Sequence, residues 1–274
     1  MIPFPVRSAR VAAITSGKGG VGKTVVSVNL SVALAEMGRQ AMLVDADIGL
    51  ANANIMLGIY ANATIEDLLT RECGVPEIVQ QGPSGLYVVP GHSGGGGTIR
   101  GIASHQRPHL ANSFRPYAGM LDHVLVDTAT GIAPQALSFA AASDLVVLVL
   151  SDEPTAFIDA YAQLRALVHD HDCAAVAVVT NMVVDDRAGA RLFAHFQEVV
   201  AQSLPVELWH LGSVPRDDSV REAIFRKRSC LEAFPRSRAS MAFRRIAATL
   251  ADHPIAMTAG GHRFFGMEFQ HGAH

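Results

Sequence analysis

The stretch GKGGVGKT at residues 17–24 decides the fold. It has the form G-x-x-x-x-G-K-[ST] and stands between an apolar run at 10–15, RVAAIT, and an apolar periodic segment at 24–37 that ends before Gly38. The flanking runs predict a strand and a helix, with the glycine as helix C-cap. A glycine-rich turn between a strand and a helix is typical of a loop whose backbone N–H groups surround phosphate oxygens.

Short apolar runs alternate with amphipathic segments along the rest of the chain. Continuous apolar runs of this kind are typical of parallel strands covered on both faces. We expect further strands at 40–45, 85–89, 123–127, 145–150, 174–180 and 208–214, and helices at 64–70, 133–142, 155–171, 187–203, 217–227 and 238–251. The alternation predicts an α/β fold: one doubly wound, mostly parallel sheet with helices on both faces, in a single domain spanning 1–251 and followed by a tail, 252–274.

Composition narrows the class of protein. Apolar residues make up 49% of the 274 and charged residues 17%, which excludes a disordered chain. The formal net charge of −3 lacks the overall excess of positive charge that is typical of nucleic-acid-binding proteins. Three widely spaced cysteines form neither a disulfide framework nor a metal motif, and no apolar run is long enough to span a bilayer. We therefore expect a cytoplasmic protein, with any membrane contact peripheral.

The loop supplies the groups that a nucleoside triphosphate needs. Lys23 places a positive charge on the outer phosphates and Thr24 offers a hydroxyl to Mg²⁺. The helix that starts there directs its positive end at the same anion. We expect the nucleotide contacts to come from Gly19, Gly20, Val21, Gly22, Lys23, Thr24 and Val25.

Acidic residues stand at the ends of two of the expected strands. Asp45 and Asp47 end VDAD, and Asp127 ends HVLVD. Carboxyl ends of parallel strands lie beside the phosphate loop, so Asp127 is expected to hold Mg²⁺, partly through water, together with Thr24 and Asp47. Asp47 is also expected to position the attacking water. The alternative is that these acids only cap strand ends.

Polar residues after two later strands are candidates for a base pocket. Asn181 follows AVAVVT, and Pro215, Arg216 and Asp217 follow LGSV. A side-chain amide and free backbone can read the edge of adenine. Ordinary turn chemistry explains the same residues equally well. The chain has no NKxD guanine signature, which favours ATP over GTP.

The motif KGGVGKT at 18–24 resembles the deviant Walker motif of the MinD/ParA ATPases. The resemblance implies that Lys18 crosses the interface of a nucleotide-sandwich homodimer to the other copy's phosphates, so that Lys18, Lys23 and Asp47 are the catalytic set. It also identifies DADIGLAN at 45–52 as a first switch and DTATG at 127–131 as a second, and places adenine at Asn181 and the VPRD segment. Thr130 departs from the common form DTAAG.

Several further segments are similar to the FlhG/FleN branch, the flagellar number regulators. They are DEPTAFIDAY at 152–161, VPRDDSVREAI at 214–224 and FPRSRAS at 234–240. The resemblance implies a weak Mg²⁺-dependent ATPase whose partner is the flagellar master transcription activator, the flagellar SRP-type GTPase, or both. The branch often carries an N-terminal DQA segment, which MIPFPVRSAR lacks, and a membrane-binding C-terminal helix.

Two surface features leave alternatives open. The apolar cluster of the tail, Phe264, Phe265, Met267 and Phe269, fits a short membrane contact at the inner face of the cell membrane or at a pole, self-docking, or a frayed end. The window 216–245 holds nine basic and four acidic residues. It fits solvated helix faces, or the DNA contact of a ParA-like partition ATPase. A third alternative is an adaptor that holds nucleotide with negligible hydrolysis.

Overall fold

Eight strands form one sheet in the order β3-β4-β2-β5-β1-β6-β7-β8. The computed structural model describes residues 9–252 except 48–49, 71–72, 92–112 and 118. The strands are β1 (Arg10–Thr15), β2 (Ala41–Ala46), β3 (Gln80–Gln81), β4 (Tyr87–Val89), β5 (His123–Thr128), β6 (Leu145–Leu150), β7 (Ala175–Val183) and β8 (Glu207–Pro215). All neighbouring pairs are parallel except β3 with β4. The predicted doubly wound, mostly parallel sheet is confirmed.

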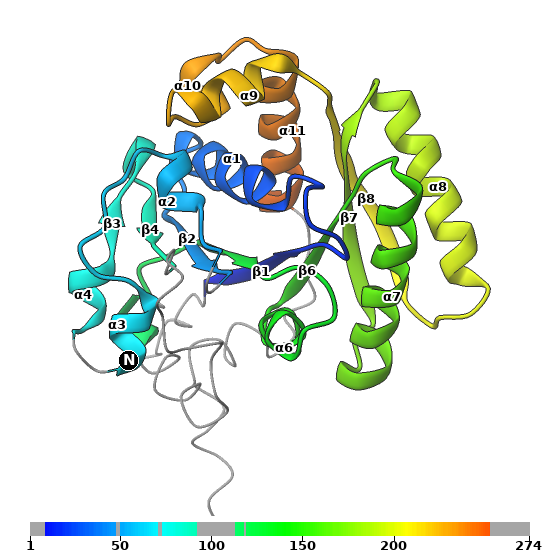
Figure 1. Cartoon of the computed structure of the whole chain (residues 1–274), viewed down its shortest axis with the longest axis horizontal. Helices are drawn as coiled ribbons and strands as arrows, with labels where there is room; N and C mark the ends of the chain where they lie inside the picture. The colour runs from blue at the N-terminus through cyan, green and yellow to red at the C-terminus, as the bar shows by residue number, and fades with distance from the viewer. Residues whose placement is uncertain (1–8, 48–49, 71–72, 92–112, 118, 253–274) are drawn as a thin grey trace, which may run out of the picture.

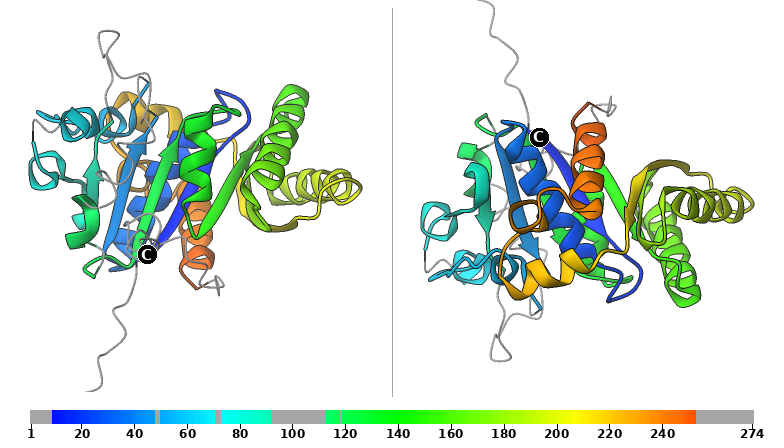
Figure 2. Two further views of the ribbon diagram at one scale, coloured as in Figure 1. Left: turned by 90° about the horizontal axis from the view of Figure 1, so that it is seen from below. Right: turned by 90° about the horizontal axis from the view of Figure 1, so that it is seen from above.

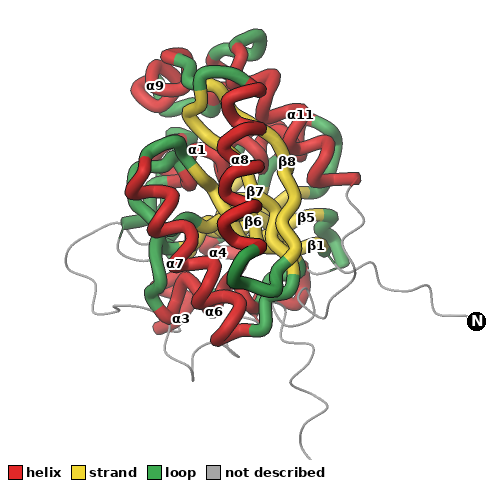
Figure 3. The backbone as a smooth tube through the Cα atoms, turned by 90° about the vertical axis from the view of Figure 1, so that its right-hand side faces the viewer, coloured by secondary structure: helices red, strands yellow, loops and turns green. Residues whose placement is uncertain are grey.

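Helices cover both faces of the sheet (Figures 1 and 2). The longer ones are α1 (Lys23–Glu36), α6 (Pro134–Ala141), α7 (Pro154–His171), α8 (Asp186–Ala201), α9 (Asp218–Phe225) and α11 (Arg238–Asp252). The shorter ones are α2 (Ala53–Met56), α3 (Ile65–Thr70), α4 (Val75–Ile78) and α10 (Cys230–Ala233), with 3₁₀ turns η1 (Pro83–Gly85) and η2 (Arg115–Tyr117). Figure 3 shows α7 and α8 lying over β6, β7 and β8.

Alternation along each strand assigns its side chains to the two faces. In β6, Leu145, Val147 and Val149 pack in the core beneath α1 and α11. Val146, Leu148 and Leu150 pack instead with α6, α7 and α8. Because successive side chains of a strand point to opposite faces, a strand covered on both faces buries all its side chains, and most of them are apolar. All six residues of β2, of β5 and of β6 are accordingly buried.

The structure corrects several expected boundaries. The expected strand at 85–89 begins only at Tyr87, because Pro83–Gly85 forms the 3₁₀ turn η1. β7 extends through Val183 and β8 through Pro215, so Asn181 and Pro215 lie within strands instead of after them. The two-residue strand β3 and the short helices α2, α4 and α10 were not expected. All are too short for hydrophobic periodicity to reveal.

The strand order brings the candidate residues together at the carboxyl ends of neighbouring central strands. β1 lies between β5 and β6, and β5 lies between β1 and β2. Asp45 of β2 is in register with Asp127 of β5, which is in register with Ile14 just before the end of β1. The phosphate loop and the two acids therefore emerge side by side, as the rule for carboxyl ends of parallel strands requires.

Candidate functional site

Glycines shape the loop at 17–24, and Gly20 and Gly22 both have a φ of +86° that residues with a side chain rarely adopt. Gly22 has φ of +86° immediately before α1, and a Cβ there would lie 2.3 Å from the amide nitrogen of Asn181. A Cβ on Gly17 would lie 2.1 Å from the carbonyl carbon of Asp159 in α7. Gly19 and Gly20 are exposed, and a Cβ on either would have no neighbour within 4 Å. The loop is thus packed at both ends and open in the middle, where an anion can approach its backbone.

Lys23 is the first residue of α1 and is almost completely buried, with 4% of its side chain exposed. Its Nζ lies 2.8 Å from Asp127 Oδ1 and 3.5 Å from Asp47 Oδ2. Burying an ammonium group is costly unless it is paired, so the two carboxylates account for its position. The structure therefore brings together the predicted phosphate lysine and both predicted switch acids.

Asp127 has one satisfied and one unsatisfied oxygen. Oδ1 accepts from Lys23 and from Ser27 Oγ at 2.8 Å. Oδ2 is buried and has no hydrogen-bond partner within the described part of the chain. A buried carboxylate oxygen left unpaired is unusual in folded proteins and costs free energy. Such an atom is suited to a cation or a cation-bound water.

Asp45 anchors the first-switch segment 45–52. Its carboxylate accepts from the backbone N–H groups of Asp47, Asn52 and Ala53, at 3.2, 2.9 and 2.9 Å. Burial, followed by repulsion from Asp127, raises the pKa of Asp45 from 3.8 to about 7, although the hydrogen bonds from Ala53 and Asp47 and the charge of Lys23 oppose the shift. Burial likewise raises the pKa of Asp47, against the attraction of Lys23. Three carboxylates against one ammonium group leave an excess of negative charge that a divalent cation would balance.

Lys18 is held by its own chain in this structure. Its Nζ lies 2.8 Å from Glu153 Oε2 and 2.7 Å from Thr155 Oγ1, at the start of α7. The hydrogen bond from Lys18 lowers the pKa of Glu153. Lys18 is 36% exposed and Glu153 is 55% exposed, so this ion pair is accessible and weak enough to exchange partners.

The four base-pocket candidates lie near the carboxyl ends of the strands. The side chains of two of them, Asn181 and Asp217, form hydrogen bonds with backbone groups. Asn181 is 4% exposed, and its Nδ2 donates to the carbonyl of Val21 at 2.8 Å. Asp217 caps α9 and accepts from the N–H groups of Ser219 and Ala239 at 2.9 and 3.0 Å. Burial acts to raise the pKa of Asp217, but these hydrogen bonds outweigh it and lower the pKa. Arg216 is exposed, and its N–H donates to Val183.

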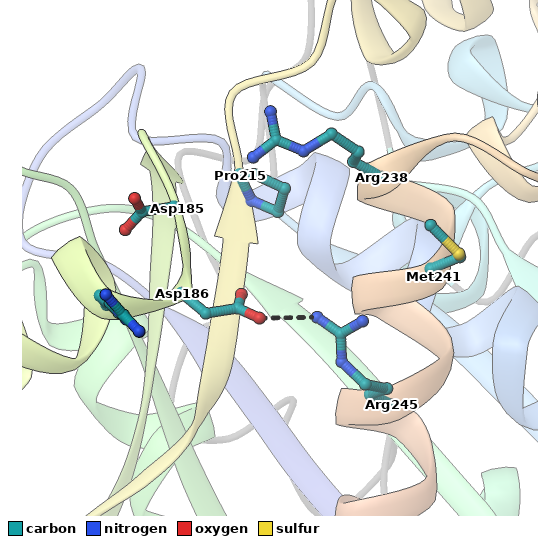
Figure 4. Close-up of a pocket in the computed structure, with 7 residues that line it drawn as sticks. Asp185, Asp186, Pro215, Arg238, Met241 and Arg245 are labelled. Atoms are coloured by element: carbon teal, nitrogen blue, oxygen red, sulfur yellow. Dashed lines mark hydrogen bonds and ion pairs between the residues drawn. The ribbon is translucent and has the colours of Figure 1, made fainter.

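Pro215 lines a cavity of about 440 Å³ between the start of α8 and one side of α11 (Figure 4). Of the four base-pocket candidates, it alone is among the lining residues. The opposing walls carry Asp186 and Arg245, whose ion pair of 3.2 Å crosses the cavity. The other lining residues are Asp185, Arg187, Arg238 and Met241. The cavity is therefore polar and open, with an apolar surface at the proline ring and the methionine.

Acidic residues form ion pairs with four of the nine basic residues in the window 216–245. Ion pairs join Arg226 to Glu222, Arg228 to Glu232, Arg244 to Glu36 and Arg245 to Asp186. Two further cation–π contacts place Arg221 over Phe225 and Arg226 over Phe234. Since surface pairs of this kind belong to ordinary solvated helix faces, the arrangement favours that interpretation of the window over a phosphate-binding stripe.

The residues present fit a magnesium nucleotide. The open loop, the buried ammonium of Lys23 and the unpaired oxygen of Asp127 supply groups for an anion and a cation. No cluster of three or more His, Cys, Asp or Glu able to hold a metal occurs among the residues that the structure describes. Proteins usually bind Mg²⁺ through one or two carboxylates while phosphate and water complete the shell.

A parallel sheet whose first strand leads through a G-x-x-x-x-G-K-[ST] loop into a helix defines a P-loop nucleotide-binding protein. Residues 12–230 match the family model described as the CobQ/CobB/MinD/ParA nucleotide binding domain. The chain belongs to this family, within its MinD/ParA deviant Walker group and the FlhG/FleN branch, and the predicted resemblance is confirmed.

Relatives and solved structures agree with that assignment. The chain is 41% identical to the antiactivator FleN of Pseudomonas aeruginosa, over 94% of this chain and 92% of the relative. It is 30% identical to the flagellum site-determining protein YlxH of Helicobacter pylori, over 89% and 82%. The structure of the septum site-determining protein MinD with Mg-ADP from Pyrococcus horikoshii matches with a TM-score of 0.73 at 26% identity, covering 88% of this chain and 96% of that one.

Sequence reasoning missed three residues that complete the site. Ser27 lies four residues after Lys23, on the same side of α1, and helical spacing could have revealed it. Glu153 and Thr155 lie in a segment used above only for its resemblance, and nothing in their local pattern indicates Lys18 as their partner.

Some expectations fall on residues whose structure is not described. The apolar cluster of the predicted tail 252–274 lies within 253–274, and two residues of the first switch are 48–49. Asp252, the first residue of the predicted tail, instead ends α11. Within the described ranges, no helix is both long and apolar enough to cross a membrane.

Proposed function

We propose that this protein is a weak Mg²⁺-dependent ATPase that dimerises with ATP and controls flagellar number or assembly through a flagellar partner. The observation that carries the proposal is the pair of lysines at one loop. Lys23 is buried between Asp47 and Asp127, while Lys18 is accessible and held only by a surface ion pair. Lys23 is placed to bind this chain's own nucleotide. Lys18 is placed to leave its ion pair with Glu153 and reach the nucleotide of a second copy.

The residues would divide the work as follows. The N–H groups of the loop and the start of α1 bind the phosphates, with Lys23 on the outer ones. Thr24, Asp47 and Asp127 hold Mg²⁺, which would neutralise charge on the phosphates, and the unpaired oxygen of Asp127 supports that assignment. Asp47 orients the attacking water. Lys18 releases Glu153 and stabilises charge on the nucleotide of the second copy, as an arginine finger does.

For the base, we propose the region of Asn181 and the segment 215–217. The cavity beside Pro215 supports a pocket there. Asn181 also links that region to the loop, because its amide donates to Val21. Binding of the base at Asn181 would therefore act on the backbone of the phosphate loop through this hydrogen bond.

The partner is proposed from the relatives. FleN is named an antiactivator and YlxH a flagellum site-determining protein. We propose that the ATP-bound homodimer binds the flagellar master transcription activator, the flagellar SRP-type GTPase, or both, and that hydrolysis releases it. The protein would act in the cytoplasm, with any contact to the inner face of the membrane or a pole peripheral and made by the tail. The pairing of the arginines in 216–245 weighs against direct DNA binding.

The test compares wild-type protein with Lys23→Ala, Lys18→Ala and Asp47→Ala. ATP turnover is measured by phosphate release and dimerisation by analytical ultracentrifugation, each with ATP, ADP or no nucleotide. We expect Lys23→Ala to lose nucleotide binding, Lys18→Ala to bind ATP as a monomer, and Asp47→Ala to form a dimer without turnover. The dimer locked by Asp47→Ala then serves to capture the partner. A monomer that hydrolyses ATP without Lys18 contradicts the sandwich, and a dimer without turnover in the wild type supports the adaptor instead.

A further inference from the structure

Gln163 lies within α7 with no exposed surface, and it bridges two parts of the site. Its Nε2 lies 2.6 Å from Thr15 Oγ1 and 3.0 Å from the carbonyl oxygen of Gly131. Thr15 is the last residue of β1, just before the phosphate loop, and Gly131 is the last residue of the second switch. Because a carbonyl only accepts, the amide nitrogen must be the atom that faces Gly131.

The side-chain oxygen of Gln163 indicates that the functional part of this amide is its N–H donor. Gln163 Oε1 is buried and has no hydrogen-bond partner among the described residues. An unpaired buried amide oxygen costs free energy, and an apolar side chain would avoid that cost. The neighbouring buried residues of α7, Leu164 and Leu167, are apolar and pack in the core. The amide is therefore a polar exception in an apolar helix face, directed at the site.

Gly131 is fixed from two directions. Its N–H donates to the carbonyl of Ser16 at 2.8 Å, while its own carbonyl accepts from Gln163. Its φ of +78° is one that residues with a side chain rarely adopt. The second switch thus ends at Gly131, which is hydrogen-bonded both to Ser16, just before the phosphate loop, and to Gln163 of α7.

The same helix carries the groups that hold Lys18. Glu153 precedes α7 and Thr155 lies in its first turn. Between these residues and Gln163, the backbone of α7 at Asp159 packs so closely on Gly17 that no Cβ fits. A single 18-residue helix therefore contacts the phosphate loop, the second switch and the crossing lysine.

We propose that Gln163 is a positioning residue that ties the second switch to α7, so that the state of the switch and the release of Lys18 are coupled through one helix. The inference rests on the proposed ATPase. It assigns Gln163 no contact with the nucleotide: its amide fixes the Gly131 carbonyl, and the helix transmits any change there to Glu153 and Thr155.

The test uses Gln163→Leu, which removes the donor at similar volume, and Gln163→Glu, which replaces it by a group that donates only when protonated. We expect Gln163→Leu to lower kcat by about tenfold or more with KM for ATP changed less than about threefold, because the loop that binds the phosphates stays intact. Burial favours the protonated acid, which can donate to Gly131. The turnover of Gln163→Glu, relative to that of wild type at the same pH, should therefore rise as the pH is lowered from about 8.5 to about 6. Gln163→Leu should show no such recovery.

Gln197, an exposed residue, provides a control for the amide-to-carbonyl hydrogen bond. Its Nε2 donates to the carbonyl of Leu208 at 3.0 Å, from α8 and away from the loop. Gln197→Leu and Gln197→Glu should leave kcat and its pH profile unchanged. A readout without nucleotide is amide hydrogen exchange at Gly131, which we expect to quicken in Gln163→Leu and not in Gln197→Leu.

The outcomes separate the two proposals. Unchanged kcat and unchanged exchange at Gly131 in Gln163→Leu overturn the positioning role, as does equal impairment of Gln163→Leu and Gln163→Glu at every pH. If wild-type protein does not hydrolyse ATP, the proposed function fails by itself. Hydrogen exchange at Gly131 still decides whether Gln163 holds the switch.

Discussion

The Nζ of Lys18 lies 2.8 Å from Oε2 of Glu153, within one chain. A lysine that is to act on a second copy's nucleotide must first leave this carboxylate. Because the pair is exposed, solvent screens it, and its loss costs little. If Lys18 crosses to a second copy as proposed, this intramolecular contact opposes dimerisation by a modest free energy.

Glu153→Gln should make dimerisation with ATP easier. The amide keeps a hydrogen-bond acceptor for Lys18 but removes the charge, so we expect the dimer to form at an ATP concentration lower by about two- to fivefold, matching the worth of a surface pair. Sedimentation over an ATP titration measures this. Asp152→Asn removes an exposed charge next to the pair and should change nothing. If both variants behave like the wild type, Glu153 does not restrain Lys18.

Asp127→Asn should weaken the dependence on Mg²⁺. The amide can still accept from Lys23 through one oxygen, but it offers the cation no negative charge in place of the unpaired Oδ2. We expect the Mg²⁺ concentration for half-maximal turnover to rise about tenfold or more. Asp170→Asn, at the exposed end of α7, is the control. Unchanged Mg²⁺ dependence in Asp127→Asn would place the cation elsewhere.

Gly17→Ala and Gly19→Ala should separate packing from binding. A Cβ on Gly17 would meet the backbone of Asp159 at 2.1 Å, so the change must displace α7 and should destabilise the fold by about 3 kcal/mol or more. A Cβ on Gly19 meets nothing within 4 Å. That variant should unfold like wild type in a denaturant titration, yet bind nucleotide more weakly in calorimetry because the methyl group faces the open loop. Equal stability of the two variants would contradict the close packing.

The sequence alone predicts the central fold well because its signals are local. The apolar runs that form β5 and β6 and the motif before α1 each lie within a few consecutive residues. The contacts of the site are different. Lys18 and Glu153 are 135 residues apart, and Gln163 and Thr15 are 148 apart. Such pairs follow from the sheet order and from how α7 packs, which no local pattern encodes.

Asp45 shows the same limit for electrostatics. Its position at the end of an apolar strand predicted a residue near the loop, but not that it would be fully buried and hold the first switch through three N–H groups. Burial is a property of the assembled sheet, and burial is the main cause of its raised pKa.

Asp45→Asn should therefore flatten the pH dependence of stability. The pKa of Asp45 in the folded protein is about 7 against an ordinary 3.8, so the protonated acid favours folding. Its contribution is complete below about pH 4 and is lost as the pH rises through about 7. Each pKa unit is worth about 1.4 kcal/mol, which makes the total on the order of a few kcal/mol. Asparagine keeps one acceptor oxygen and has no proton to lose.

We expect the free energy of unfolding of wild-type protein to fall more steeply between about pH 4 and about pH 7 than that of Asp45→Asn, in urea titrations without nucleotide. Asp217→Asn is a control of opposite sign, because the pKa of Asp217 is lowered and its charged form stabilises the protein at neutral pH. That variant should lose stability at pH values above the ordinary pKa of an aspartate. Parallel curves for wild type and Asp45→Asn would mean that Asp45 is ionised throughout, and that its three hydrogen bonds outweigh its burial.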